Sequence, residues 1–307
     1  MMVLRFLRPW LMVALAAALA GGVGLGLAWL VGDYLIARAE PGTSASPPGR
    51  LLTIDGHAVH VTEFGDGPPV LLLHGLAGSS EEWPPALRTP LAHSYRTITV
   101  DLYGMGFSAR DEAFSYDTDL WTEQLAAVVV ALDLGQVSLV GRDLGAIVAV
   151  TFAGRHPEQV RRLVLIAPRV PLSSGDEPTR MRALRVPGLG EAVIGWSLAA
   201  LPGRRAHPAA AVEVTWQIPG TRHAVLAAVR TGVDPDTFRI AAHAVRAPTL
   251  VLHGRADTIT PLAAVERWVP LIENVMVRPL DDVGHWPAQQ TPDTVADATI
   301  DFLGGSP

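Results

Sequence analysis

Residues 139–147 read LVGRDLGAI, and this short stretch decides the fold class of the chain. An apolar run ends at Gly141, and a second apolar run begins directly after Asp143 and Leu144. Glycines on both sides of the acidic residue permit a tight turn between a strand and a helix, with the side chain at the turn lifted into the open. Because the start of a helix favours negative charge, we expect Asp143 to be ionised. The pattern therefore predicts a presented carboxylate at the end of a strand.

Short β-rich runs alternate with helical stretches on both sides of this turn. Several of the apolar runs are continuous, as is typical of parallel strands that are covered on both faces. The alternation indicates a doubly wound α/β sheet that is mostly parallel. The predicted strands are 57–63, 69–73, 96–101, 137–140, 162–167, 248–253 and 274–279, and the predicted helices are 80–92, 117–133, 144–155, 261–270 and 291–303. Asp117 or Thr118 is expected to cap the second of these helices.

The interval 171–240 interrupts this alternation, because it is rich in proline and contains no convincing strand. Helical pieces such as 189–200 occur in it, so we expect a helical cap insertion over the carboxyl edge of the sheet. The globular domain as a whole is predicted to span 50–307. The preceding stretch 41–49, PGTSASPPG, has the composition of a linker.

The N-terminal residues 9–32 contain no charge and are long enough to cross a bilayer as a helix, which needs about 20 apolar residues. Arg5 and Arg8 precede this run, and the positive-inside bias places the N-terminus in the cytoplasm. We therefore predict a signal anchor over residues 1–40, with the globular domain on the extracytoplasmic side of the membrane. Cleavage after the small-x-small stretch 37–39, which would give a secreted protein, and a merely buried helix stay open as alternatives.

The composition argues against several kinds of partner and site. The chain has 307 residues, a net charge of −6 at pH 7 and no block of basic residues, so no nucleic-acid partner is expected. Cysteine is absent, which excludes disulfides, thiolate nucleophiles and cysteine-bound metals. No metal cluster is visible, and no cofactor is expected. The oligomeric state stays open.

Three residues that can carry chemistry follow predicted strands, at the edge where α/β sheets place their ligands. They are Asp143, Asp257 and His285, in the chain order nucleophile position, acid, histidine. A fourth stretch, HGLAGSS at 74–80, also follows a predicted strand. Its glycines allow a backbone N–H to point at a developing oxyanion.

The sequence resembles the α/β-hydrolase fold family over residues 50–305, on five stretches in the order expected for that family. These stretches are LLLHGLAGSS, VDLYGMGFSA, LVGRDLGA, LVLHGRADTITP and VGHWPAQQTPDTV. The resemblance implies a catalytic triad of Asp143, Asp257 and His285. It also implies an oxyanion hole formed by the backbone N–H groups of Leu76 and Leu144.

An aspartate in place of a serine changes the electrophile that such an enzyme attacks. A carboxylate that attacked a carbonyl carbon would form an anhydride, whereas displacement of a halide or opening of an epoxide leaves an alkyl-enzyme ester. His285 would then activate a water that hydrolyses the ester, with Asp257 orienting the imidazole. Within the family, an aspartate at this position resembles epoxide hydrolases and haloalkane or haloacid dehalogenases. A small apolar epoxide or organohalide is therefore the predicted substrate.

Some residues depart from the pattern of those aspartate enzymes. Leu144 follows the aspartate, where they often have an aromatic residue or an arginine, and Leu76 stands where dehalogenases usually have asparagine or glutamate. Epoxide hydrolases use two cap tyrosines, yet none of the four tyrosines lies in 171–240. The insertion offers other polar side chains as candidate pocket residues, namely Trp196, Trp216, His207 and His223.

Two other interpretations of Asp143 stay open beside the covalent one. Asp143 can act as a base or an anchor in a general α/β-fold hydrolase, a lyase or an isomerase, where product forms without an ester. The turn can also belong to a catalytically inactive binding protein. Arg142 is expected to point away from the pocket or to pair with a surface acid, and His74 to shape its loop through hydrogen bonds.

Overall fold

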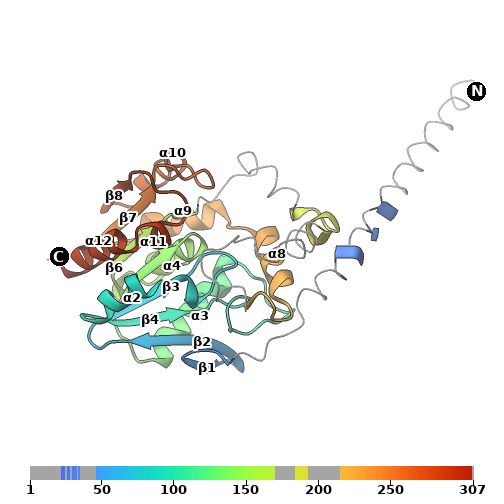
Figure 1. Ribbon diagram of the computed structural model, residues 1–307, viewed down its shortest axis with the longest axis horizontal. Helices are drawn as coiled ribbons and strands as arrows, with labels where there is room; N and C mark the ends of the chain where they lie inside the picture. Colours follow the sequence, from blue (N-terminus) through green and yellow to red (C-terminus); the bar gives the residue numbers. More distant parts are fainter. Residues whose placement is uncertain are drawn as a thin grey trace, which may run out of the picture.

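An eight-stranded sheet forms the centre of the protein (Figure 1). The structure, a computed structural model, describes residues 22–24, 26, 27, 30–32, 34, 46–169, 184–192 and 215–305. The strands are β1 (Arg50–Ile54), β2 (His57–Phe64), β3 (Pro69–Leu73), β4 (Arg96–Val100), β5 (Val137–Arg142), β6 (Val160–Ile166), β7 (Thr249–Gly254) and β8 (Val275–Leu280), in the spatial order β1-β2-β4-β3-β5-β6-β7-β8. β2 runs antiparallel to both of its neighbours, and every other neighbouring pair is parallel. The predicted mostly parallel α/β sheet is confirmed.

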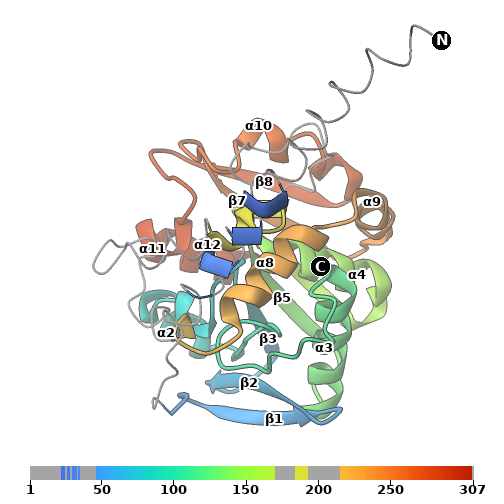
Figure 2. The same ribbon diagram turned by 90° about the vertical axis from the view of Figure 1, so that its right-hand side faces the viewer.

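Both faces of the sheet are apolar and covered by helices. Successive strand residues point to opposite faces, so in β3 Leu71 and Leu73 join one hydrophobic cluster while Val70 and Leu72 join the other. Figure 2 shows the helices in two layers. One layer contains α3 (Thr118–Ala131), α4 (Leu144–Arg155) and α9 (Pro235–Ala244), and the other contains α2 (Pro85–Ala92), α11 (Pro287–Gln290) and α12 (Pro292–Gly304).

Prolines and one hairpin account for the differences from the predicted elements. The predicted helix 261–270 is divided into α10 (Leu262–Val265) and a short 3₁₀ turn that contains Pro270, whose ring and missing N–H oppose a continuous helix. β1 was not predicted, although Asp55 and Gly56 form a two-residue turn with positive φ at both positions. Asp117 caps α3 as predicted, accepting a hydrogen bond from the Leu120 N–H.

The predicted cap insertion is described only in part. Residues 170–183 and 193–214 lie outside the described residues, so the insertion over 171–240 stays a prediction. Its later part contains α8 (Thr221–Thr231) and the start of α9, and α9 packs against α4 in a helical layer of the sheet. The division into a linker over 41–49 and a domain from residue 50 likewise stays a prediction.

The structure corrects the prediction of a transmembrane helix over residues 1–40. Among the described residues, no helix is both long enough and apolar enough to cross a membrane. The signal anchor, the membrane contact and the single-pass extracytoplasmic localisation rested on that helix, and they fall with it. The remaining residues of this stretch, including the alternative cleavage position at 37–39, lie outside the described residues.

The turn at 139–147 is built by close approach of three elements. β5 ends at Arg142, α4 begins at Leu144, and Asp143 between them has φ 47° and ψ −110°, an unfavourable conformation for a residue with a side chain. A Cβ atom on Gly141 would lie 2.4 Å from the Gly145 carbonyl oxygen, and one on Gly145 would lie 2.2 Å from the Leu73 carbonyl oxygen. Only glycine at these two positions allows α4 to pack this tightly against β5 and β3.

We expect Gly145→Ala to lower the free energy of unfolding by roughly 1–3 kcal/mol, because the added methyl group meets fixed backbone. Gly304→Ala is the matched control, since its nearest neighbour is the Tyr95 hydroxyl at 3.6 Å and it should be nearly neutral. Urea unfolding of both variants measures the difference. Equal stability of the two variants would contradict this account of the turn.

Candidate active site

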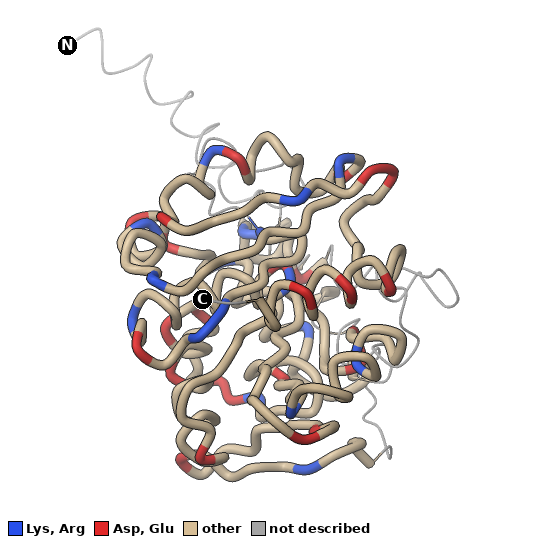
Figure 3. Tube along the Cα trace, turned by 90° about the vertical axis from the view of Figure 1, so that its left-hand side faces the viewer, with Lys and Arg blue, Asp and Glu red and all other residues tan. Residues whose placement is uncertain are grey.

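Basic and acidic residues are interspersed along the chain trace (Figure 3). Four charged side chains are buried near the edge where the parallel strands end: Glu82, Arg142, Asp143 and Asp257 are each at most 4% exposed. Buried charges are costly unless they are paired, so their partners define the site.

The Asp143 carboxylate accepts hydrogen bonds from two groups and faces a histidine. The Leu76 N–H donates to Oδ2 at 3.0 Å, and Arg169 donates from Nε to Oδ1 at 3.0 Å and from Nη2 to Oδ2 at 3.3 Å. The Nε2 atom of His285 lies 4.0 Å from Oδ1, too far for a direct hydrogen bond and close enough for electrostatic attraction. One oxygen is thus held by the backbone, while the other faces the imidazole.

The pKa of Asp143 is lowered well below that of an ordinary aspartate. Burial alone would raise this pKa, but the nearby side chains of Arg169, Arg142 and His285 lower it by more, and the hydrogen bonds from Arg169 add to their effect. The carboxylate is therefore ionised throughout the neutral range, which a carboxylate nucleophile requires.

His285 and Asp257 form the pair that the sequence predicted. Nδ1 of His285 donates to Asp257 Oδ2 at 2.8 Å, which leaves Nε2 as the basic nitrogen on the side of Asp143. The second oxygen of Asp257 accepts the N–H groups of Ile259 and Thr260. Burial alone would raise the pKa of Asp257. The hydrogen bonds from His285 and the Thr260 backbone lower this pKa by more, so the carboxylate stays charged.

The two predicted oxyanion donors differ in the free protein. The Leu76 N–H already donates to Asp143, whereas the Leu144 N–H at the start of α4 makes no hydrogen bond to that carboxylate in the part of the chain that the structure describes. His74 holds the Leu76 loop in place: its Nδ1 donates to the Gly75 carbonyl, and its Nε2 accepts the Leu102 N–H. This agrees with the structural role expected for His74.

Arg142 does not meet a surface acid as expected; it pairs with the fully buried Glu82. Glu82 also accepts the Gly75 N–H at 3.3 Å, so this acid contacts the loop of Leu76. Arg142 donates to the His285 carbonyl at 3.4 Å, and its guanidinium lies 3.9 Å from the centre of the Trp286 ring. The Arg142–Glu82 pair therefore connects the oxyanion loop, the turn and the histidine loop.

Sequence reasoning missed Arg169, and it missed Glu82, which is the partner of Arg142. Arg169 stood two residues beyond the predicted strand 162–167, so inspection of every strand end would have found it. No short motif reveals Glu82, because its partner lies 60 positions away.

The candidate pocket residues are only partly described. Trp196 and His207 lie outside the described residues. Trp216 donates through its indole N–H to the Ala77 carbonyl at 3.1 Å, so it lies against the oxyanion loop, whereas His223 is exposed on α8.

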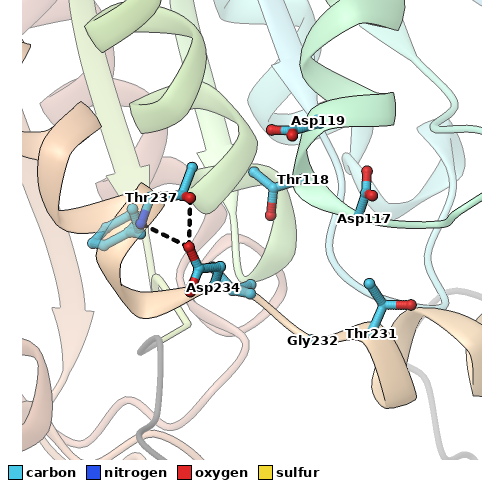
Figure 4. A pocket seen from close by; sticks show the side chains of 9 residues that line it. Asp117, Thr118, Asp119, Thr231, Gly232, Asp234 and Thr237 are labelled. Carbon is cyan, nitrogen blue, oxygen red and sulfur yellow. Dashed lines mark hydrogen bonds between the residues drawn. The ribbon is translucent and has the colours of Figure 1, made fainter.

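A cavity of about 170 Å³ lies elsewhere, between α3, α8 and α9 (Figure 4). None of the triad residues lines it, and two of its acids, Asp117 and Asp234, serve as helix caps. Among the described residues no group of three or more histidine, aspartate or glutamate side chains is arranged to hold a metal ion.

Comparison with known proteins agrees with this geometry. A family model described as the α/β hydrolase fold matches residues 68–207. Over these residues the chain matches the α/β-hydrolase fold family. This α/β hydrolase is 28% identical over 253 residues to 2-hydroxy-6-oxo-2,4-heptadienoate hydrolase of Pseudomonas putida. The aligned residues cover 78% of this chain and 90% of that protein. It is 35% identical over 142 residues to a haloalkane dehalogenase of Agrobacterium fabrum, 44% of this chain and 46% of that protein.

A solved structure gives the same fold. The epoxide hydrolase CorEH superimposes on this α/β hydrolase with a TM-score of 0.69 at 23% identity, over 83% of this chain and 98% of that one. At this level of identity the likeness supports the fold and leaves the reaction to be argued from the site.

Glu82→Gln should destabilise this α/β hydrolase by about 3–5 kcal/mol, because it leaves the buried Arg142 charge unpaired. Glu158→Gln removes the same group from an exposed pair with Arg246, and its effect should stay within about 0.5 kcal/mol. Urea unfolding compares the two, and similar losses would contradict the role given to the buried pair.

Arg169→Met should raise the pKa of Asp143, because burial is then opposed by fewer positive charges. A lowered folded-state pKa adds stability above the unfolded value of about 3.9, and this stability is lost as the pH falls. The variant should therefore be less stable than the wild type at neutral pH, with a difference that shrinks below about pH 4. Unfolding measured over a pH series tests this, and a difference independent of pH would contradict it.

Proposed function

We propose that this hydrolase uses Asp143 as a covalent nucleophile against a saturated carbon, with the ester then hydrolysed by water activated by His285. The observation that carries the proposal is the asymmetry of the carboxylate. Oδ2 is held by the Leu76 N–H at 3.0 Å, and Oδ1 faces the basic nitrogen of a histidine that is backed by Asp257. The substrate class is an organohalide or an epoxide.

In the first step, Oδ1 of Asp143 forms a bond to the substrate carbon as the bond to the leaving group breaks. A halide departs as the anion, and an epoxide oxygen departs as an alkoxide that takes a proton from solvent. The lowered pKa of Asp143 keeps the nucleophile ionised. Arg169 is the positively charged side chain that donates hydrogen bonds to both oxygens of this carboxylate.

In the second step, Nε2 of His285 takes a proton from a water that attacks Cγ of Asp143. Negative charge then develops on Oδ2, where the Leu76 N–H already donates. The Leu144 N–H, at the start of α4, is the second donor in this proposal, and one such donor contributes about 3 kcal/mol to the transition state. Asp257 stabilises the imidazolium, and collapse of the intermediate frees the alcohol and regenerates the carboxylate.

Similarity to known enzymes supports this proposal over part of the chain. The 142 residues shared with the haloalkane dehalogenase are 35% identical, a higher value than for the longer match to the Pseudomonas putida hydrolase. An epoxide hydrolase shares the architecture. Both proteins are named for the two substrate classes that a carboxylate nucleophile suits.

A second candidate function is hydrolysis of a 2-hydroxy-6-oxo-dienoate, the kind of substrate for which the relative from Pseudomonas putida is named. The observation in its favour is the length of the similarity, which covers 78% of this chain, against 44% for the haloalkane dehalogenase. In this alternative, Asp143 acts as a base or an anchor and no ester forms.

Single-turnover labelling in H₂¹⁸O separates the two candidates. With enzyme in excess over an epoxide or organohalide, the ester mechanism puts one ¹⁸O into Asp143 and leaves the first product unlabelled. Mass spectrometry of the peptide around residue 143 provides the measurement, with Asp143→Asn as the inactive control. Label in the product and none in the peptide would refute the covalent step.

A further inference from the structure

We propose that Arg169 binds a carboxylate of the substrate, and that the substrate is a small organic anion whose reacting carbon lies next to that carboxylate. This inference rests on the proposed function, and it replaces the apolar substrate expected from the sequence. The position of Arg169, its unused donors and the charge balance of the site carry it.

Both the backbone and the side chain of Arg169 form hydrogen bonds with Asp143. It follows β6 at the carboxyl edge of the sheet, and its N–H donates to the Asp143 carbonyl at 3.2 Å. The side chain of Arg169 is 28% exposed, whereas that of Asp143 is 6% exposed. The guanidinium therefore lies on the solvent side of the carboxylate, where a substrate has to arrive.

The guanidinium keeps donors available for a second anion. Of its five N–H groups, two donate to Asp143. The other three make no hydrogen bond within the described residues. A planar guanidinium presents N–H groups along more than one edge, so it can bridge two carboxylates.

The charge balance argues for an anionic substrate. With a neutral substrate, a guanidinium bonded to both oxygens of Asp143 only stabilises the carboxylate and weakens it as a nucleophile. With an anionic substrate, the same group offsets the repulsion between two carboxylates and aligns them. Arg142 cannot take this role, because it is 1% exposed and paired with Glu82.

The overall reaction balances for a 2-halocarboxylate. The bond from Asp143 Oδ1 to the second carbon forms as the carbon–halogen bond breaks, and halide leaves. Water then cleaves the ester at Cγ, giving a 2-hydroxycarboxylate, halide and one proton. Throughout both steps, Arg169 holds the substrate carboxylate and takes part in no bond change.

Binding is tested with two ligands that share a skeleton and differ in charge. These are 2-chloropropanoate and 2-chloropropanamide, titrated calorimetrically into Asp143→Asn, which cannot form the ester and frees Arg169 from its ion pair. We expect the anion to bind roughly 10- to 100-fold more tightly than the amide. Adding Arg169→Met should abolish that preference, and adding Arg169→Lys should keep part of it.

The control for the arginine substitution is Arg246→Met, which removes an arginine from an exposed ion pair near the start of β7, at the opposite edge of the sheet. It should leave the preference for the anion unchanged. Equal binding of the acid and the amide, or a preference that survives Arg169→Met in a folded variant, overturns the inference.

Chloride release by the wild-type protein separates this inference from the proposed function. Arg169-dependent binding without chloride release or ¹⁸O in Asp143 supports the anion site and refutes the covalent mechanism. Turnover of both ligands at equal rates with ¹⁸O in Asp143 supports the covalent mechanism and overturns the anion site.

Discussion

The site depends on keeping one buried carboxylate ionised. Asp143 is almost without solvent, and an uncompensated charge there would be neutralised rather than kept. The protein compensates it with the Leu76 N–H, the start of α4 and the guanidinium of Arg169. At an effective dielectric constant near 20, a unit charge 4 Å away contributes about 4 kcal/mol, so nearby positive charges can offset the cost of burying the carboxylate.

That carboxylate in turn fixes the geometry around it. The backbone angles of Asp143 are unfavourable. They persist because the glycines on both sides let β3, β5 and α4 pack closely around the turn. The Arg142–Glu82 pair extends the same constraint to the loops that carry Leu76 and His285. Asp143, Leu76 and His285 are thus held by one connected set of buried contacts, as the proposed mechanism requires of its reacting groups.

Much of the fold and of the site could be predicted from the sequence because both depend on local sequence patterns. Continuous apolar runs gave the parallel strands, and strand ends placed Asp143, Asp257 and His285 at one edge. Glu82 could not be found in this way, because its partner is fixed only by packing. The apolar N-terminal run shows the opposite failure: composition alone predicted a membrane span that no described helix supports.

Trapping the ester in His285→Gln tests the central claim most directly. Without the base, the first step can proceed while the second stalls. Given a substrate that the wild type converts, the variant should gain the mass of an organohalide less that of the hydrogen halide, or the whole mass of an epoxide. Peptide mapping should place the added mass on Asp143, with none in the double variant Asp143→Asn/His285→Gln. Substrate consumption by His285→Gln without any adduct, or an adduct on another residue, would contradict the account.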